Sequence, residues 1–453
     1  MTVKIGVVGT GYVGAVQGAG MAHLGHEVVS VDIDPVKIEQ LQKGIAPIHE
    51  PGLSELIESG IAANRLIYTT DYGALALHEV EAVFLCLPTP PNEDGSADLT
   101  YLLSAAESIA GVMKTDTVLV NKSTVPTGSA EKVAAHVAPF TQDGVTLHVA
   151  SNPEFLREGS AVADFLEPSS IIIGTDSAHA LSVMRNVYAS FDKDILFETD
   201  PRTAELIKYG RNGFRSVKIT FMNNMTEVAH QVGANIDDLM HAMTMDPVVG
   251  EHFVSPGPGW GGSCFPKDSR ALLATAQTAG VPFEQLERTM VDNERHKGRV
   301  VEQILTHFGK DIMGKKIAVL GAAFKANTDD IRESPAIHII QLLAGHGAEV
   351  TVYDPQAMEN AQKYLAKLES VSFADSALIA AKDADSIVIA TEWPEFSAIE
   401  IAQYAEIMRD RVIFDARNLF DPKDDSTDGP VADMRKHGFT YKSFGRQDLT
   451  PNE

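Results

Sequence analysis

The feature that most constrains the fold is the glycine-rich segment GTGYVG, which follows directly on an apolar run from Lys4 to Val8. After a strand, Gly9 makes a tight turn, Gly11 lets backbone N–H groups approach a pyrophosphate, and Gly14 lets the following helix pack closely. An acidic residue, Asp32, ends the next apolar run. Strand, turn, helix and acid in this order predict a βαβ unit that holds the phosphates of a dinucleotide at a helix N-terminus.

The acid also selects between the two nicotinamide dinucleotides. A carboxylate at Asp32 can hydrogen-bond the adenine ribose hydroxyls and would repel a 2′-phosphate. The adjacent Ile33 and Asp34 supply no arginine to offset that repulsion. The sequence therefore predicts NAD rather than NADP as cofactor.

Short apolar runs alternate with longer helical patterns over residues 1–199. Such alternation implies right-handed crossovers and a parallel sheet, so this part is predicted to be α/β. The further strands expected are 27–32, 82–87, 118–121 and 171–174. From Asp200 the strands stop, and an Asp-Pro pair predicts the start of a long helix through residue 233, followed by more helix over 267–308.

Strands return at KKIAVLGAAFK, and the chain then repeats its own beginning, because GHEVVSVDIDP (25–35) is echoed by GAEVTVYDP (347–355). We therefore predict an α/β fold of two Rossmann-like doubly wound lobes, joined by a helical centre and a long connecting helix. The expected domains are a first Rossmann domain over 1–199, a central helical domain over 200–308 and a second Rossmann-like domain over 309–453.

The second lobe has an altered turn, with Gly321 followed by Ala323 and Lys325. A methyl group replaces hydrogen where a pyrophosphate must approach closely, so a second dinucleotide is not expected. Two interpretations stay open: Lys325 holds the phosphate of a mononucleotide, or the turn is a structural remnant. The acid at Asp354 persists in either case.

Composition excludes several classes of function. The net charge of −25, from 62 acidic and 37 basic residues, repels nucleic acid and anionic lipid. The two cysteines, Cys86 and Cys264, have neither disulfide nor metal-ligand spacing, so no metal is expected and a reducing compartment fits. Without a signal peptide or a spanning apolar stretch, the chain is predicted to be cytoplasmic.

Cys264 lies in the polar, glycine-rich segment PGPGWGGSCFPKD. A free cysteine has a pKa of about 8.5, and an ammonium nearby, such as that of Lys267, favours the nucleophilic thiolate. A buried hydrophobic role is the alternative for any lone cysteine, and it is the one that suits Cys86 in FLCLP.

Two other segments carry groups suited to catalysis. In NPEFLRE, Asn152 and Pro153 resemble the start of a helix that places Glu154 and Glu158 on one face, although helix-dipole complementarity alone could explain both acids. Lys208 and Asn212 stand four apart on the predicted long helix. Spacing alone cannot separate an active site from a solvated helix face there.

At GPGWGGSCFPKD, taken with GTGYVG, KSTVP, SNPEFLREG and GAAFKANTDDIRESPAI, the chain resembles the UDP-glucose 6-dehydrogenase family, whose relatives include GDP-mannose and UDP-N-acetylmannosamine dehydrogenases. The motifs follow the family's order over nearly the full length. The resemblance implies oxidation of UDP-glucose to UDP-glucuronate by two hydride transfers to NAD. It also implies UDP binding by the third domain and a homodimer, or higher homo-oligomer, built on the middle helices.

The resemblance implies roles for individual residues. Cys264 would be the nucleophile, Glu154 would assist thioester hydrolysis, and Lys208 would stabilise oxyanions. Asn212, Thr124 and Asp268 would place the sugar and a water. The NAD contacts implied are Gly9, Gly11, Tyr12, Val13, Gly14, Asp32, Lys37, Thr89, Thr124, Glu158, Lys267 and Arg332. The substrate contacts implied are Glu154, Phe155, Leu156, Lys208, Asn212, Phe253, Val254, Ser255, Gly257, Gly261, Lys325 and Arg417.

One departure from the family pattern bears on the substrate. Where relatives read Asp-x-Arg-Ile-Gly, this chain has Val248 between Asp246 and Gly250, so an arginine that typically reaches the sugar from a neighbouring subunit is absent. Another nucleotide sugar, GDP-mannose or an N-acetylated UDP-hexosamine, is therefore an alternative. A catalytically silent NAD-binding relative is a second alternative, and the presence of Cys264, Lys208 and Glu154 argues against it.

Overall fold

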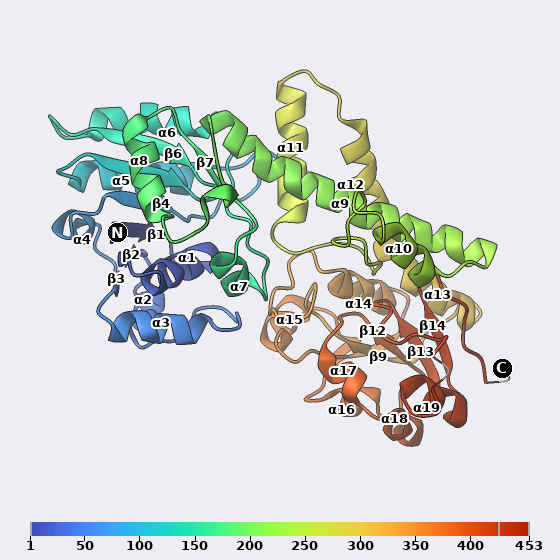
Figure 1. The fold of residues 1–453 in the computed structure, drawn as a ribbon. Helices are drawn as coiled ribbons and strands as arrows, with labels where there is room; N and C mark the ends of the chain where they lie inside the picture. The colour runs from blue at the N-terminus through green and yellow to red at the C-terminus, as the bar shows by residue number, and fades with distance from the viewer. Residues whose placement is uncertain (1, 425, 452–453) are drawn as a thin grey trace. The chain divides into compact units, whose positions relative to one another are not determined.

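The computed structural model describes residues 2–424 and 426–451, and the chain forms two compact units (Figure 1). The first unit comprises Met1–Arg211 and Lys267–Pro282, and the second comprises Asn212–Pro266 and Phe283–Glu453. Two helices, α9 (Pro201–Val232) and α11 (Phe265–Thr278), have residues in both units. The three domain boundaries expected from the sequence stay a prediction.

The first unit is built on an eight-stranded sheet of order β3-β2-β1-β4-β5-β6-β7-β8. Neighbouring strands are parallel except β6 and β7, which are antiparallel. The order from β3 to β6 is that of a doubly wound dinucleotide-binding sheet. The five strands predicted from the sequence are confirmed, and β3, β6 and β8 are additional. The strands are β1 (Lys4–Val8), β2 (Glu27–Val31), β3 (Leu66–Thr69), β4 (Ala82–Leu85), β5 (Thr117–Asn121), β6 (Leu147–Ser151), β7 (Ile171–Gly174) and β8 (Leu196–Thr199).

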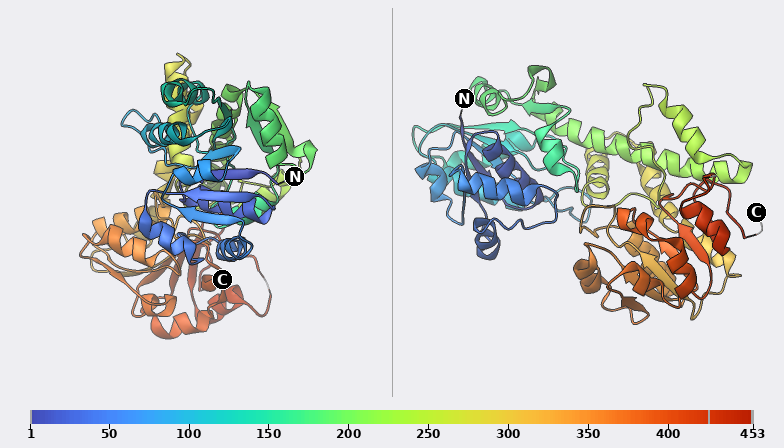
Figure 2. Two further views of the ribbon diagram at one scale, coloured as in Figure 1. Left: turned by 90° about the vertical axis from the view of Figure 1, so that its left-hand side faces the viewer. Right: turned by 60° about the horizontal axis from the view of Figure 1, so that its bottom comes forward.

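Helices cover both faces of this sheet, as the views in Figure 2 show. Along β4, Ala82 and Phe84 belong to one apolar core and Val83 and Leu85 to the other, because successive side chains point to opposite faces. The first core includes α1 (Tyr12–His23), α2 (Pro35–Gln42), α3 (Leu53–Ala62), α7 (Ala161–Leu166) and α8 (Ala178–Val187). The second includes α4 (Gly73–Leu77), α5 (Thr100–Val112) and α6 (Ser129–Val137). Two short 3₁₀ segments are Ala138–Phe140 and Lys193–Ile195.

The second unit contains a six-stranded sheet of order β11-β10-β9-β12-β13-β14, with all neighbours parallel. This order repeats that of β3-β2-β1-β4-β5-β6, which confirms that the echo in the sequence reflects a repeated fold. The strands are β9 (Lys316–Leu320), β10 (Glu349–Tyr353), β11 (Val371–Phe373), β12 (Ser386–Ile389), β13 (Val412–Asp415) and β14 (Thr440–Ser443). One continuous apolar core surrounds the sheet.

The sequence predicts more helix over 267–308, and the structure has three helices there. Gly280, with a positive φ of 70°, follows α11, and Gly298 separates α12 from α13. No helix within residues 2–424 and 426–451 is long and apolar enough to cross a membrane. The remaining helices are α10 (Ile236–Thr244), α12 (Glu284–Lys297), α13 (Arg299–His307), α14 (Pro335–Gly345), α15 (Met358–Leu365), α16 (Ala377–Ala381), α17 (Pro394–Ala398), α18 (Ile401–Ile407) and α19 (Pro430–His437).

Candidate active site

The three glycines of GTGYVG have distinct local surroundings. Gly9 has a φ of 89°, and a Cβ there would lie 2.5 Å from the carbonyl oxygen of Cys86. A Cβ on Gly14 would lie 1.7 Å from the carbonyl oxygen of Gly9, whereas one on Gly11 would meet no atom within 4 Å. The turn and the helix packing therefore require two of the glycines, and the space above Gly11 suits a pyrophosphate at the start of α1.

Asp32 lies at the end of β2 and holds this loop together. Its Oδ2 accepts hydrogen bonds from the Thr10 backbone N (2.7 Å) and hydroxyl (2.8 Å), and Lys37 Nζ lies 3.1 Å away. Burial raises the pKa of the carboxyl, but these bonds and one from the Asp34 backbone outweigh burial, so the pKa is lowered. The group is ionised at neutral pH, as the predicted ribose contact requires.

Other predicted NAD residues also lie in the first unit. The Thr89 hydroxyl donates to the Thr124 carbonyl oxygen at 2.9 Å, and both residues are buried. The Tyr12 hydroxyl donates to Glu50, which also accepts from the backbone N of Gly159 at 2.7 Å. Glu50 was not predicted, and it fixes the loop that follows the buried Glu158. Val13 is half-buried at the start of α1.

One predicted NAD residue, Arg332, lies in the second unit. Its side chain is exposed and pairs with Asp330 at 2.7 Å.

A buried ion pair joins two of the predicted catalytic residues. Lys208 Nζ lies 2.7 Å from Glu154 Oε1 and donates to the Glu154 carbonyl oxygen at 2.8 Å. Glu154 Oε2 accepts from the Leu156 backbone N at 2.6 Å. Both side chains of the pair are almost fully buried, so in the first unit Lys208 faces the protein and the solvated-face interpretation is wrong.

The helix start predicted at NPEFLRE is also wrong, because the chain is not helical until α7. Asn152 cannot act as an N-cap there because its side chain is used elsewhere. Its Oδ1 accepts from Lys122 Nζ (2.9 Å) and the Tyr188 hydroxyl (2.6 Å), and its Nδ2 donates to the Ile172 carbonyl oxygen (2.6 Å). The sequence offered no indication of these distant partners.

Two residues that follow the candidate nucleophile form an ion pair in the first unit. Lys267 Nζ lies 2.6 Å from Asp268 Oδ1, and Asp268 is fully buried at the start of α11. The ammonium that was expected to favour a thiolate is therefore shared with a neighbouring carboxylate. Asp268 is held in one position, which suits a residue that orients a sugar or a water.

The two cysteines differ in their burial. Cys264 is half-buried directly before α11, in the second unit, and its Sγ lies 3.5 Å from the Ser263 hydroxyl. Cys86 is buried, and that burial raises the pKa of its thiol to about 12. At neutral pH Cys86 is therefore protonated and unreactive.

The loop that carries Cys264 is held by side chains that the sequence did not single out. Asn293 Oδ1 accepts from the Trp260 backbone N at 2.8 Å, and Asn293 Nδ2 donates to the Trp260 carbonyl oxygen at 3.0 Å. The Trp260 indole donates to the Thr220 hydroxyl at 2.8 Å, and Asn223 accepts from the Gly257 backbone N at 3.0 Å. These buried bonds fix the loop on α9 and α12.

Several predicted substrate residues converge within the second unit. A Cβ on Gly261 would lie 2.2 Å from the Glu333 carbonyl oxygen, so only glycine fits there. A Cβ on Gly257 would meet the Arg417 guanidinium at 3.4 Å. Arg417 in turn donates to the Phe324 carbonyl oxygen at 2.6 Å, next to Lys325. The Cys264 loop and the altered turn GAAFK therefore lie against each other.

Asp354 stands in the second lobe at the position that corresponds to Asp32, and its hydrogen bonds show that it has a structural role there. Its Oδ2 accepts from the backbone N of Ala322 (2.8 Å) and Ala323 (3.0 Å), the position that Thr10 occupies on Asp32. It also accepts from the Trp393 indole at 3.0 Å and is fully buried. These bonds give Asp354 a structural role, because they hold the first turn of the second lobe to the end of β10.

Two arginines of α9 stack on predicted substrate residues. The Arg211 guanidinium lies 4.1 Å from the centroid of the Phe155 ring and donates to Ser170 at 2.7 Å. The Arg215 guanidinium lies 4.7 Å from the centroid of Phe253, whose φ is 63°. Beyond Phe253, Val254 is buried and Ser255 is exposed, while Leu156 is half-buried.

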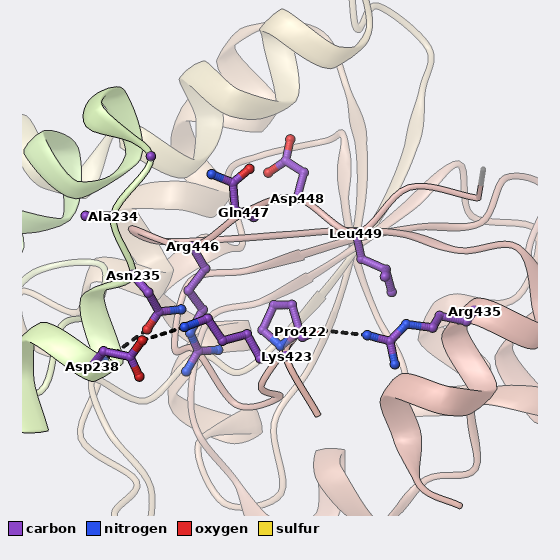
Figure 3. A pocket seen from close by; sticks show the side chains of 11 residues that line it. Ala234, Asn235, Asp238, Pro422, Lys423, Arg435, Arg446, Gln447, Asp448 and Leu449 are labelled. Carbon is purple, nitrogen blue, oxygen red and sulfur yellow. Dashed lines mark hydrogen bonds and ion pairs between the residues drawn. The ribbon is translucent and has the colours of Figure 1, made fainter. Parts of the chain in front are cut away.

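A cavity of about 460 Å³ in the second unit contains none of the predicted site residues (Figure 3). Its cations have partners: Lys423 lies beside Asp238, and Arg435 donates to the Pro422 carbonyl oxygen at 2.8 Å. Arg446 forms a bidentate pair with Asp237. The cavity is therefore not the candidate active site.

Comparison with known proteins covers nearly the whole chain. Models of the UDP-glucose/GDP-mannose dehydrogenase family match residues 3–192 as its NAD binding domain, 202–295 as its central domain and 318–422 as its UDP binding domain. A UDP-glucose 6-dehydrogenase of Rhizobium meliloti (strain 1021) is 43% identical over 98% of this chain and 100% of that protein. One of Bacillus subtilis (strain 168) is 38% identical over 99% of this chain and 95% of that protein.

Solved structures are similar over the same extent. A UDP-glucose dehydrogenase of Pyrobaculum islandicum has a TM-score of 0.86 and 36% identity, covering 92% of this chain and 95% of that one. A UDP-D-ManNAc dehydrogenase of Pyrococcus horikoshii has a TM-score of 0.84 and 31% identity, covering 98% and 99%.

Substitutions at two glycines should separate folding from cofactor binding. Gly14→Ala should lower the thermal midpoint, because its Cβ would collide with a backbone oxygen 1.7 Å away. Gly11→Ala should keep the thermal midpoint, since the space there is open. It should weaken the binding of NAD by about tenfold or more, because the added methyl group displaces the pyrophosphate. Thermal unfolding and calorimetric titration with NAD measure both effects. Wild-type NAD affinity in Gly11→Ala would contradict the assignment.

Proposed function

The chain belongs to the UDP-glucose/GDP-mannose dehydrogenase family, and on this premise we propose that it oxidises UDP-glucose to UDP-glucuronate through covalent catalysis by Cys264. It is an NAD-dependent oxidoreductase. The substrate rests on relatives named as UDP-glucose 6-dehydrogenases along nearly the full chain. The observation that carries the mechanism is the contrast between the half-buried Cys264, on a loop held by side chains, and the buried Cys86.

Conversion of an alcohol to a carboxylate removes four electrons, and NAD when bound accepts them as one hydride in each of two oxidations. Between the oxidations, the Cys264 thiolate adds to the C6 aldehyde, and the oxygen takes a proton to give a thiohemiacetal. Loss of the second hydride and of that proton leaves a thioester on Cys264. The covalent bond keeps the aldehyde from leaving at the intermediate stage.

Hydrolysis of the thioester requires a base and a stabilised oxyanion. We assign the base to Glu154, which would take a proton from the attacking water while the C–S bond breaks and the thiolate leaves. Lys208 already donates to two oxygens of Glu154, and its ammonium would stabilise the negative oxygen. Asn212, one turn further along α9, would donate to the same oxygen, with Thr124 and Asp268 placing sugar and water.

The nucleotide would bind to the second lobe. Arg417 donates to the carbonyl oxygen of Phe324 in the turn that contains Lys325. This turn lacks the glycines that would let phosphates approach the backbone, so the Lys325 ammonium would bind the diphosphate instead. This arrangement favours phosphate binding over a structural remnant for Lys325. In a chain of charge −25, such local cations are what an anionic substrate requires.

The absence of an arginine at position 248 favours a second candidate, the same chemistry on an N-acetylated UDP-sugar. Val248 is 91% exposed, and its apolar side chain offers the sugar neither a charge nor a hydrogen bond. A structural relative with a TM-score above 0.8 is named as a UDP-D-ManNAc dehydrogenase. The sugar is therefore the part of the proposal that most needs a direct assay.

We further propose that the active form is a homodimer built on α9. Phe214, Phe221 and Val228 recur every seven residues on this helix and are 67%, 53% and 51% exposed. Residues seven apart lie on one face of a helix, so the three form an apolar stripe. A second copy of the same stripe would bury it in a symmetric interface.

Loss of the nucleophile should stop turnover. In Cys264→Ser, steady-state NADH formation with UDP-glucose should fall by roughly 10³-fold or more, because the covalent step is lost. Cys86→Ala is the matched control and should turn over at a rate close to wild type. Absorbance of NADH gives the rates, and mass spectrometry of intact protein detects the adduct. A Cys264→Ser enzyme with wild-type turnover would rule out the covalent mechanism.

A panel of nucleotide sugars should identify the substrate. UDP-glucose should give the highest kcat/KM, ahead of UDP-N-acetylmannosamine, UDP-N-acetylglucosamine and GDP-mannose. Val248→Arg should raise kcat/KM for UDP-glucose by about tenfold, the value of one charge-assisted hydrogen bond. Preference for an N-acetylated sugar would replace UDP-glucose with the second candidate.

A charge within the stripe should separate the dimer. Phe221→Glu should give a monomer in sedimentation velocity, because it would bury like charges across a symmetric interface. Met313→Glu, at an exposed apolar residue off α9, is the control and should leave the mass unchanged. Identical masses for Phe221→Glu and wild type would refute this interface.

A further inference from the structure

A second lysine is buried beside the Glu154–Lys208 pair. Lys122 follows β5 in the KSTVP segment and is 8% exposed. Its Nζ donates to Asn152 Oδ1 at 2.9 Å. Within residues 2–424 and 426–451, no salt bridge to a carboxylate involves Lys122. A buried ammonium whose contact is a neutral amide is unusual in a folded protein.

Keeping this ammonium buried has a cost. Burial is the largest cause that lowers the pKa of Lys122, and the charge of Lys208 acts in the same direction. Cys86 and Glu154 raise the pKa, and the net result is a pKa of about 8. A methionine could fill much of the same space with no charge to desolvate. Stability alone therefore does not explain a lysine at this position, and buried groups that cost stability concentrate at functional sites.

The Lys122 ammonium donates to Asn152, and the Asn152 side-chain amide has two further hydrogen-bond partners. The same Oδ1 accepts from the Tyr188 hydroxyl at 2.6 Å, and the Nδ2 donates to the Ile172 carbonyl oxygen at 2.6 Å. Asn152 is joined to Glu154 through Pro153, whose ring fixes φ. Any shift of Asn152 is therefore passed along a stiff segment to Glu154.

We propose that Lys122 is a positioning residue for Glu154: it fixes Asn152, and through Asn152-Pro153 it sets where the Glu154 carboxylate meets Lys208. The carboxylate and carbonyl of Glu154 must both meet Lys208, at 2.7 and 2.8 Å, so the segment tolerates little displacement. This inference rests on the proposed role of Glu154 in thioester hydrolysis.

The test compares Lys122→Met with Tyr188→Phe, which removes the other hydrogen bond to Asn152 Oδ1 but no charge. In Lys122→Met we expect kcat to fall by on the order of tenfold to a hundredfold, because the base is displaced. The KM values for NAD and UDP-glucose should stay near wild type, and the thermal midpoint should be unchanged or higher. The Cys264 thioester should accumulate in intact-protein mass spectra, as it should in Glu154→Gln. Tyr188→Phe should keep most of kcat.

Three results would overturn the inference. These are a wild-type kcat in Lys122→Met, an equal loss of kcat in Tyr188→Phe, or a lower thermal midpoint with kcat and KM changed together. If wild-type protein oxidises no nucleotide sugar, the proposed function fails instead. A crystal structure of Lys122→Met then decides the inference: the carboxylate of Glu154 must leave Lys208, and an unmoved carboxylate would disprove it.

Discussion

The ion pair between Glu154 and Lys208 is the interaction on which the account depends. It joins the segment after β6 to the start of α9 with two short bonds in a buried environment. Removal of one partner of such a pair strongly destabilises a protein, because the other charge is left buried without a partner. The pair therefore holds both segments in place. The pair also helps to explain why residues 152–157 are not helical although the local sequence favours a helix, since Lys208 bonds both the carboxylate and the carbonyl of Glu154.

In both lobes an aspartate holds the turn after the first strand, but the two turns differ in what they can bind. In each, an aspartate at the end of the second strand accepts hydrogen bonds from the backbone N–H groups of the first turn, Asp32 from Thr10 and Asp354 from Ala322. In the first lobe the turn keeps open space above Gly11. In the second lobe Arg417 donates to the carbonyl oxygen of Phe324 in the turn, next to Lys325. We propose that this altered turn suits the second lobe to a nucleotide diphosphate rather than a dinucleotide.

Features that depend on residues close together in the sequence could be predicted, and features that depend on residues far apart in the sequence could not. Strands such as β1 and β7, the Gly9 turn and the start of α9 directly after Asp200 depend on neighbours in sequence, and all were predicted. Asn152 failed as a helix cap because its partners, Lys122 and Tyr188, come from distant elements. For the same reason Glu50, Asn293 and the stacked Arg211 could not be predicted, because their partners lie far away in the sequence.

The central claim is a four-electron oxidation of UDP-glucose at C6. The most direct measurement is the molar ratio of NADH formed to UDP-glucose consumed when a limiting amount of UDP-glucose is exhausted, with the product identified by mass spectrometry. We expect two NADH for each UDP-glucose, with UDP-glucuronate as the sole product. One NADH for each sugar with release of the aldehyde, or no NADH at all, would contradict it.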